Sequence, residues 1–246
     1  MATPWDARTY DQTSQPQQSW AQDVLDRLSG IDPTSTVLDV GCGTGRVTQQ
    51  LLELVPQGTV LAIDASQDMV DLARARLGDR VRVWRESALD LQLEQPVDAI
   101  FSTATLHWVP DHERLWRVFA KALRPGGRAE IQCGGEGNIA SVRRAIDIAA
   151  ASHPQLAGWS PWEFASPATT ERRLRDAGFV DTRCWLESRP TWPEDVGAFV
   201  RTSILAAHLE RLAPERREPF AQEVLERVDV PLDYVRLNIS AVRAGP

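Results

Sequence analysis

The fold is decided by one glycine-rich stretch of the chain, Val37-Leu38-Asp39-Val40-Gly41-Cys42-Gly43-Thr44-Gly45. A short apolar run over residues 36–40 leads into the glycines, and a helical pattern follows over residues 46–55. Glycines at such a turn permit a tight bend and the close approach of a ligand to bare backbone. We therefore expect a strand, a ligand-binding turn and a helix in this order.

An acidic residue follows the next apolar run. Residues 59–63 have the pattern of a second strand, and Asp64 stands at its end. A carboxylate at this place can accept hydrogen bonds from both hydroxyl groups of an adenosine ribose. The glycine turn and Asp64 together predict a site for a nucleoside-bearing cofactor at the carboxyl edge of the sheet.

The residues beside the glycines indicate which cofactor this site takes. The spacing is Gly-x-Gly-x-Gly, and Arg46 stands where the dinucleotide-binding pattern has its third glycine. Asp39 would repel a pyrophosphate but suits the ammonium group of a methionine moiety. An acidic residue also helps to accommodate a sulfonium cation. These features favour S-adenosylmethionine and disfavour a nicotinamide-dependent dehydrogenase.

Apolar runs and helical patterns alternate along the chain. In the first half we expect strands at residues 36–40, 59–63, 81–84, 97–102 and 128–133, and helices at residues 46–55, 67–77 and 112–123. In the second half we expect helices at residues 139–151 and 169–177 and strands at residues 179–188 and 232–242. This alternation predicts an α/β fold with a seven-stranded, mostly parallel sheet and helices on both of its faces.

The chain carries no internal repeat, low-complexity tract or flexible linker, so we expect a single domain. Two polar, helix-like stretches predict a helical insertion that caps the carboxyl edge of the sheet. The expected parts of residues 1–246 are N-terminal cap helices (1–35), a cofactor-binding core (36–133) and an acceptor-side half (134–246) with the insertion at about 194–228.

Composition restricts the partners of the protein. The chain has 246 residues, of which 43% are hydrophobic, and a formal net charge of -7. Proteins that grip phosphate backbones or anionic membranes usually present a basic face, so we expect no nucleic acid or membrane partner. The three cysteines, Cys42, Cys133 and Cys184, are odd in number and lack metal-ligand spacing.

The N-terminal residues carry no secretory-signal pattern, and no run approaches the roughly 20 apolar residues that span a bilayer. We therefore expect a cytoplasmic protein without a metal that acts on a small molecule. Its oligomeric state stays open.

Three motifs in unbroken order resemble those of class I S-adenosylmethionine-dependent methyltransferases. Residues 37–45 resemble the first motif of that family, residues 63–69 the second, and residues 123–127 the loop before the fifth strand. The resemblance covers residues 36–133. It implies a Rossmann-like class I methyltransferase fold, S-adenosylmethionine as cofactor, and methyl transfer as the activity.

The same resemblance implies roles for particular residues. Asp39, Gly41 and Gly43 would contact the methionine end of the cofactor, and Asp64 its ribose. Ser87 stands where family members often carry an aspartate that reaches the adenine amino group, and a hydroxyl there is a weaker acceptor. The full set of expected cofactor residues is Tyr10, Asp39, Gly41, Cys42, Gly43, Asp64, Ala65, Met69, Ser87, Ala88 and Thr103.

The segment after the fourth strand should border the reacting groups. It contains His107, which is the candidate for a base or for a hydrogen-bond donor to the substrate; alternatively His107 only packs within the loop. A carboxylate nucleophile needs no base because it is ionised at neutral pH, whereas an alcohol, amine or phenol can require one. Trp108, Trp159 and Trp162 fall where an acceptor pocket would form.

Two stretches narrow the resemblance to the trans-aconitate methyltransferase subgroup. One is the N-terminal opening with Trp5 and Tyr10, and the other is Leu106-His107-Trp108-Val109-Pro110-Asp111-His112. His107 stands where glutamine is common in that subgroup. The tryptophans suit an apolar or aromatic acceptor, whereas a polycarboxylate would require arginines, and the cap region contains Arg143, Arg144, Arg201 and Arg236.

The sequence therefore predicts a methyltransferase acting on a small molecule, with O-methylation of a carboxylate or hydroxyl favoured. Two alternatives remain. The protein could form C- or N-methyl bonds on a biosynthetic intermediate. It could also hold S-adenosylmethionine without catalysis, because methyl transfer can proceed without an acid/base set and the sequence therefore does not distinguish an enzyme from a binding protein.

Overall fold

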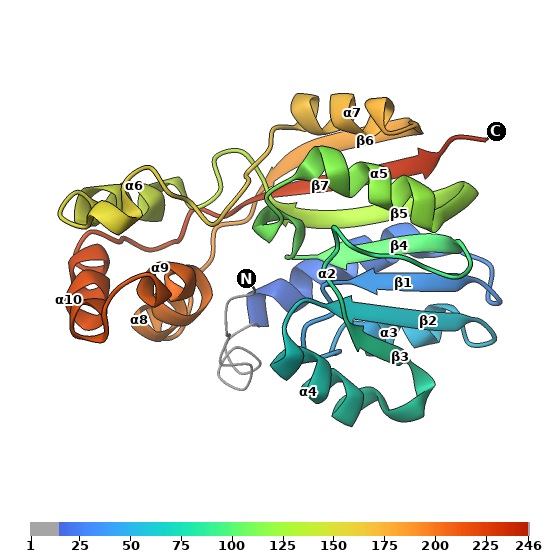
Figure 1. Ribbon diagram of the computed structural model, residues 1–246, viewed down its shortest axis with the longest axis horizontal. Coiled ribbons are helices and arrows are strands. Elements are labelled where there is room, and N and C mark those ends of the chain that lie inside the picture. Colours follow the sequence, from blue (N-terminus) through green and yellow to red (C-terminus); the bar gives the residue numbers. More distant parts are fainter. Residues whose placement is uncertain (1–14, 246) are drawn as a thin grey trace.

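The computed structural model describes residues 15–245 of the chain. Its centre is a seven-stranded sheet in the order β3-β2-β1-β4-β5-β7-β6 (Figure 1). Neighbouring strands from β3 to β5 are parallel, and β7 is antiparallel to both β5 and β6. This topology confirms the predicted Rossmann-like α/β fold. The strands are β1 (Thr36–Val40), β2 (Thr59–Asp64), β3 (Arg82–Arg85), β4 (Val97–Thr103), β5 (Leu123–Gly134), β6 (Phe179–Ser188) and β7 (Val235–Arg243).

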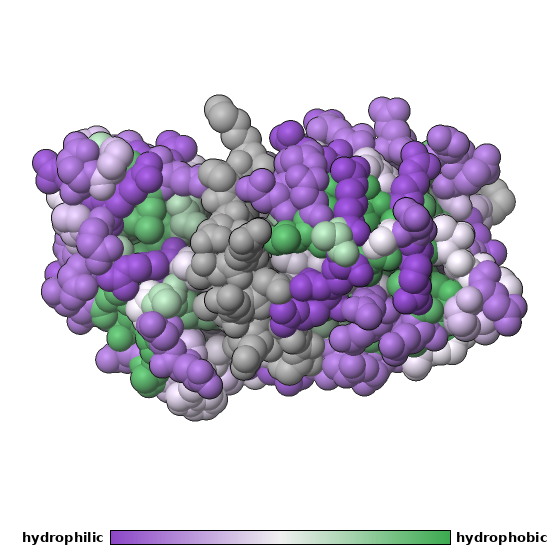
Figure 2. All heavy atoms as spheres, turned by 90° about the horizontal axis from the view of Figure 1, so that it is seen from below, coloured by the Kyte–Doolittle hydropathy of each residue, from purple (hydrophilic) through white to green (hydrophobic). Residues whose placement is uncertain are grey.

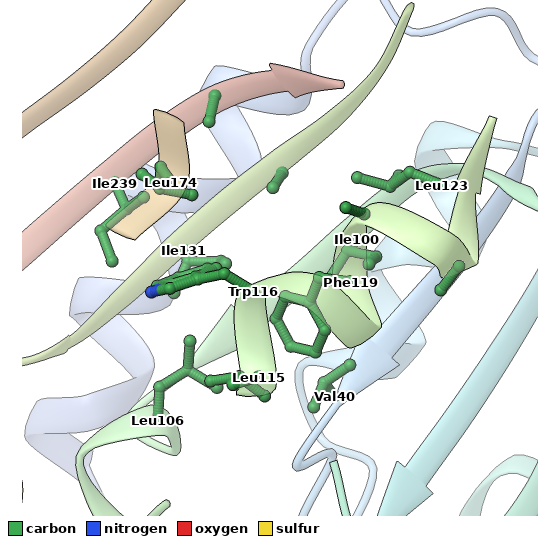
Figure 3. Close-up of a cluster of buried hydrophobic side chains, with 14 of the residues drawn as sticks. Val40, Ile100, Leu106, Leu115, Trp116, Phe119, Leu123, Ile131, Leu174 and Ile239 are labelled. Atoms are coloured by element: carbon green, nitrogen blue, oxygen red, sulfur yellow. The ribbon is translucent and has the colours of Figure 1, made fainter. Parts of the chain in front are cut away.

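Helices cover both faces of the sheet, because successive residues of a strand point to opposite faces. On one face, α5 (His112–Ala122) and α7 (Pro167–Asp176) bury apolar side chains against the strands. Trp116 and Phe119 of α5 lie in this layer (Figure 3). Their ring centroids are 5.7 Å apart in an edge-to-face arrangement. The other face is covered by α2 (Gln15–Leu28), α3 (Thr48–Leu54) and α4 (Gln67–Leu77).

A helical lobe lies beyond the carboxyl ends of the parallel strands (Figure 1). It has its own apolar core, which includes Ile146, Phe199, Phe220 and Leu232. The lobe occupies the place expected for the cap over the sheet edge. It consists of α6 (Ala140–Ala150), α8 (Val196–Phe199), the π-helical turn η4 (Val200–Ile204), α9 (Ala206–Glu210) and α10 (Pro214–Leu225).

The structure differs from the prediction where turn residues occur inside an element. The prediction of a loop at residues 123–127 was wrong, because β5 already begins at Leu123, which pairs with Val97. The register shifts before Ala99 pairs with Arg128, so the proline and glycines form an irregularity within the strand. The first part of the expected insertion at about 194–228 consists of several short helical pieces, α8, η4 and α9, instead of one helix.

The last strand also starts later than predicted. Leu232 pairs with Thr191 in an isolated bridge, and β7 begins only at Val235. Figure 2 shows a largely hydrophilic surface over both the lobe and the sheet, with small separate hydrophobic areas. Within residues 15–245, no helix combines the length and the apolar character needed to cross a bilayer.

Candidate functional site

The glycine turn between β1 and α3 has a backbone that only glycine adopts readily. Gly41, Gly43 and Gly45 have φ angles of +74°, +54° and +77°. A Cβ atom on Gly41 would stand 2.2 Å from the side chain of Thr105, whereas one on Gly43 would meet no atom of residues 15–245 within 4 Å. The turn therefore packs tightly against the segment after β4, and the described residues leave space beside Gly43.

Asp64 at the end of β2 is tied to this turn. Its Oδ2 accepts a hydrogen bond from the Gly43 amide and its Oδ1 one from the Ser66 amide, both at 2.9 Å. Burial raises the pKa of Asp64, and these backbone hydrogen bonds oppose that rise. A carboxylate offers about four acceptor positions, so acceptor capacity remains for the hydroxyls of a ribose.

Asp39 is the buried carboxyl group of the site, with an exposed fraction of 2%. Thr48 of α3 donates a hydrogen bond from its hydroxyl to Asp39 Oδ2 at 2.6 Å. Burial raises the pKa of Asp39 to about 7, against the lowering effect of the Thr48 hydrogen bond. A cation brought to this place would favour the ionised form, so the group fits the ammonium of a methionine moiety.

Four further residues of the expected cofactor set, Ala65, Met69, Ser87 and Ala88, follow β2 and β3. Ala65 is exposed and Met69 is buried, and Ser66 between them caps α4. After β3, the hydroxyl of Ser87 accepts a hydrogen bond from the Leu89 amide at 3.2 Å, and Ala88 is half-buried. The Ser87 hydroxyl therefore already accepts a hydrogen bond within the turn that follows β3.

The structure thus brings Asp39, Gly43 and Asp64 together, and Thr103 ends the neighbouring strand β4. Cys42 is buried, and its thiol lies 3.6 Å from the Gly43 carbonyl oxygen. Tyr10, the remaining predicted cofactor residue, lies outside the described residues, as does Trp5.

Several groups around the turn were missed from the sequence. Thr105 donates from its hydroxyl to the carbonyl oxygens of Gly41 and Thr103, at 3.2 and 2.9 Å. Arg76 of α4 donates to the carbonyl and hydroxyl oxygens of Thr44 at 2.5 and 2.6 Å. The contacts of Thr105 with Gly41 and of Arg76 with Thr44 join elements distant in the chain, so no local pattern signals them.

His107 lies in the short helix η2 (Leu106–Trp108) that follows β4. The Gly134 amide at the end of β5 donates a hydrogen bond to His107 Nδ1 at 3.2 Å. Burial, together with the nearby charge of Arg236 and with His112, lowers the pKa of His107 well below its ordinary value. The ring is therefore neutral at physiological pH.

The three predicted tryptophans come together in one aromatic array. Trp108 and Trp162 have ring centroids 5.8 Å apart, and Trp162 is stacked on Phe164 at 5.5 Å. His208 of α9 lies 5.1 Å from Trp159 and 5.2 Å from Trp162, and this residue was not predicted. The array links the end of β4 to the lobe.

The arginines of the cap region are dispersed. Arg143 stands over the ring of Phe164 at 5.6 Å, and Arg201 pairs with Glu218 at 2.7 Å. Arg144 is exposed. Arg236 is 2% exposed and stands over the ring of Trp20 at 4.7 Å, so it is the one of the four buried near the sheet edge.

The parallel sheet, the glycine turn and the two carboxyl groups define a protein that binds a nucleoside-bearing cofactor at the carboxyl edge of its sheet. A family model described as a methyltransferase domain matches residues 37–127. A trans-aconitate 2-methyltransferase of Deinococcus radiodurans is 33% identical over 184 residues, which cover 72% of this chain and 70% of that protein. The chain belongs to the class I S-adenosylmethionine-dependent methyltransferases and resembles their trans-aconitate methyltransferase subgroup, and S-adenosylmethionine is its cofactor.

Two further likenesses agree with this assignment. A trans-aconitate 2-methyltransferase of Azoarcus sp. (strain BH72) is 36% identical over 134 residues, but the match spans only 50% of that protein and 52% of this chain. A solved phosphoethanolamine N-methyltransferase 2 of Haemonchus contortus, in complex with S-adenosylhomocysteine, is 16% identical and has a TM-score of 0.67. It covers 97% of this chain and 57% of the other, and it shows the shared fold.

Proposed function

We propose that the protein transfers a methyl group to an oxygen atom of a small molecule, either a carboxylate or a hydroxyl. The observation that carries this proposal is the position of His107 and the aromatic array. His107 and Trp108 follow β4, the strand next to β1, so they adjoin the glycine turn at the same edge of the sheet, and Trp162 packs on Trp108. The names of the two bacterial relatives, trans-aconitate 2-methyltransferases, also support an acceptor that carries carboxylates.

The cofactor would be held along the ends of β1, β2 and β3. Asp39 would receive the ammonium group and Asp64 the ribose hydroxyls, because both are acceptors fixed at the turn. The remaining proposed contacts are those of Tyr10, Gly41, Cys42, Gly43, Ala65, Met69, Ser87, Ala88 and Thr103.

S-adenosylmethionine supplies an activated methyl group on a cationic sulfur. This group would pass to an oxygen of the acceptor and leave a neutral thioether; a carboxylate would accept it in its ionised form, and a hydroxyl would release its proton to solvent. The protein's residues therefore have to position the acceptor in line and exclude water. Trp108, Trp159 and Trp162 would supply the apolar wall for the acceptor.

The lobe and the sheet would work as one domain over residues 1–246. Among the contacts that join the parts, the Glu163 amide donates to the His107 carbonyl oxygen at 2.9 Å, and Trp20 of α2 belongs to the apolar core of the lobe. The net charge of -7 disfavours a nucleic-acid acceptor.

A first experiment is a thermal-shift titration with S-adenosylmethionine, S-adenosylhomocysteine and NAD in parallel. A ligand that binds only the folded state adds about 2.7 kcal/mol at a hundredfold excess over its dissociation constant. Stabilisation by the two sulfur compounds alone is expected.

The second step is a methyl-transfer assay on a panel of carboxylic acids and phenols that includes trans-aconitate, with mass spectrometry of the product. A methyl ester or ether supports the proposal. A C- or N-methylated product from a wider panel would contradict it and favour the other enzyme class. Cofactor binding without turnover of any panel member would favour a non-catalytic binding protein.

A further inference from the structure

The amide of Gly134 lies two residues beyond Gln132, the last residue of β5 that pairs with β4. Thr103 pairs with Gln132, and the Ala104 amide donates to the Gln132 carbonyl oxygen at 2.8 Å. Ala104 then takes a left-handed backbone with φ of 54°, and the chain leaves the sheet. Because successive residues of a strand direct their amides to opposite sides, the next amide that faces β4 belongs to Gly134.

His107 satisfies this amide. The Gly134 amide donates to His107 Nδ1 at 3.2 Å, while the Gly135 amide points the other way, to the Val235 carbonyl oxygen of β7. An imidazole nitrogen that accepts a hydrogen bond carries no proton, so the proton of a neutral ring sits on Nε2. The structure therefore fixes the tautomer of His107 as Nε2–H.

The surroundings hold the ring in this place. The rings of Trp108 and Phe164 lie 5.3 and 5.8 Å from the His107 ring, and the Glu163 amide holds the His107 carbonyl oxygen. Gly134 has no room for a side chain, because a Cβ atom would stand 2.6 Å from the Phe164 ring. The Phe164 ring therefore packs directly on the Gly134 backbone, beside the His107 ring.

The titratable and charged groups around His107 oppose its protonation. Among residues 15–245, Arg236 of β7 and His112 of α5 both lower the pKa of His107. The nearby Cys133 thiol of β5 stays neutral, because burial raises its pKa to about 12. His112 itself donates from Nε2 to the Leu106 carbonyl oxygen at 2.9 Å. None of these groups supplies His107 with a carboxylate partner of the kind that would turn the ring into a base.

We infer that His107 is a specificity residue that donates a hydrogen bond from Nε2 to the methyl acceptor, and that the Gly134 amide is the positioning group that fixes this role. The inference rests on the proposed function and decides between the two roles considered for His107. A His107 ring with its proton fixed on Nε2 can donate a hydrogen bond to an acceptor oxygen that has a free lone pair when it binds. It offers no base to an acceptor whose proton must first be removed.

Two substitutions test the roles of the two ring nitrogens of His107 separately. In His107→Asn the amide oxygen can take the place of Nδ1 and still accept from Gly134, but no group reaches the Nε2 position. In His107→Gln the longer side chain places an N–H donor near Nε2 and gives up the Gly134 contact. His153→Gln, which changes a histidine that packs on Phe220 in the lobe, is the control.

The activity test uses trans-aconitate as the first acceptor, or whichever acceptor the panel returns. We expect His107→Gln to keep KM within a few-fold and His107→Asn to raise KM about ten- to a hundredfold, the value of one hydrogen bond to a charged group. Affinity for S-adenosylmethionine should not change in either variant. Loss of kcat in both variants, with a rate that rises with pH in the parent protein, would indicate a base and overturn the inference. Full activity of His107→Asn, together with loss of activity in His107→Gln, would indicate that His107 has only a structural role and would also overturn the inference.

A second readout does not require turnover. Long-range proton–nitrogen NMR correlations in the ¹⁵N-histidine-labelled full chain, saturated with S-adenosylhomocysteine, report which nitrogen of His107 is protonated. We expect the Nε2–H form without titration between pH 6 and 8. An Nδ1–H form, or titration in this range, overturns the inference even where methyl transfer is confirmed. Absence of methyl transfer with an Nε2–H signal would instead count against the proposed function.

Discussion

Replacement of Asp39 by asparagine should stabilise the free protein while it weakens cofactor binding. The folded-state pKa of Asp39 is raised from 3.8 to about 7, chiefly by burial. Between these two values the folded protein keeps a proton that the unfolded chain releases, so the free energy of unfolding falls as pH rises across this window. Above pH 7 the loss is complete.

The size of the effect follows from the pKa shift. About three pKa units at 1.36 kcal/mol each give a cost of about 4 kcal/mol at pH 8. Asp39→Asn removes the ionisation and can still accept the Thr48 hydrogen bond. For a chain of this length, 1 kcal/mol corresponds to about 2–4 °C in Tm. We therefore expect the apo variant to melt about 8–16 °C higher than the parent at pH 8 and about 3–6 °C higher at pH 5, where about 1.2 of the pKa units have been crossed, and to melt at a similar temperature only below about pH 4.

Cofactor affinity should show the opposite pattern. Binding of an ammonium group requires the ionised carboxyl, so the affinity of the parent should fall about tenfold per pH unit below 7. Calorimetric titrations with S-adenosylhomocysteine from pH 5 to 8 measure this, and Asp39→Asn should bind weakly at every pH. Asp147→Asn, at an exposed position of α6, is the control. A flat affinity profile in the parent, or an apo variant no more stable than the parent at pH 8, would refute the reasoning.

Three further outcomes are expected at the same edge of the sheet. Asp64→Asn should weaken S-adenosylmethionine binding about ten- to a hundredfold by calorimetry, because a charged acceptor for the ribose is lost; unchanged affinity would contradict the assigned role. Gly41→Ala should lower the free energy of unfolding by more than 1 kcal/mol in urea titrations, since φ is +74° and Thr105 stands where the Cβ would go; a neutral result would show that the turn adapts. Trp162→Ala should raise the acceptor KM at constant cofactor affinity, because it removes the ring stacked on Phe164, and an equal change in both affinities would argue for general loosening of the lobe.

The cofactor half of the fold could be predicted from the sequence because its signals are local. The glycines, the acidic residue after β2 and the alternation of apolar runs each depend on neighbouring residues. The limits of β5 could not be predicted, because Pro125 and Gly126 have the composition of a turn, and only pairing of Leu123 with Val97 draws them into the strand.

The acceptor side was less predictable for a different reason. The Gly134 amide and His107 meet because β5 continues to Gly134, beyond the last residue that pairs with β4. The relative lengths of two paired strands depend on the whole sheet and leave no pattern in the sequence. His208 joins the tryptophans only because the lobe folds back toward them. The raised pKa of Asp39 likewise depends on burial that three-dimensional packing creates.

The order of strands at one side of the sheet has a consequence for synthesis on the ribosome. In the described part of the chain, β6 pairs with β7 alone, and the lobe segment with α8, α9 and α10 is translated between them. A nascent chain that has completed α10 therefore still exposes one edge of β5 and both edges of β6. Only β7 pairs with these edges, so until it emerges the nascent chain carries unpaired strands of the kind that favour aggregation.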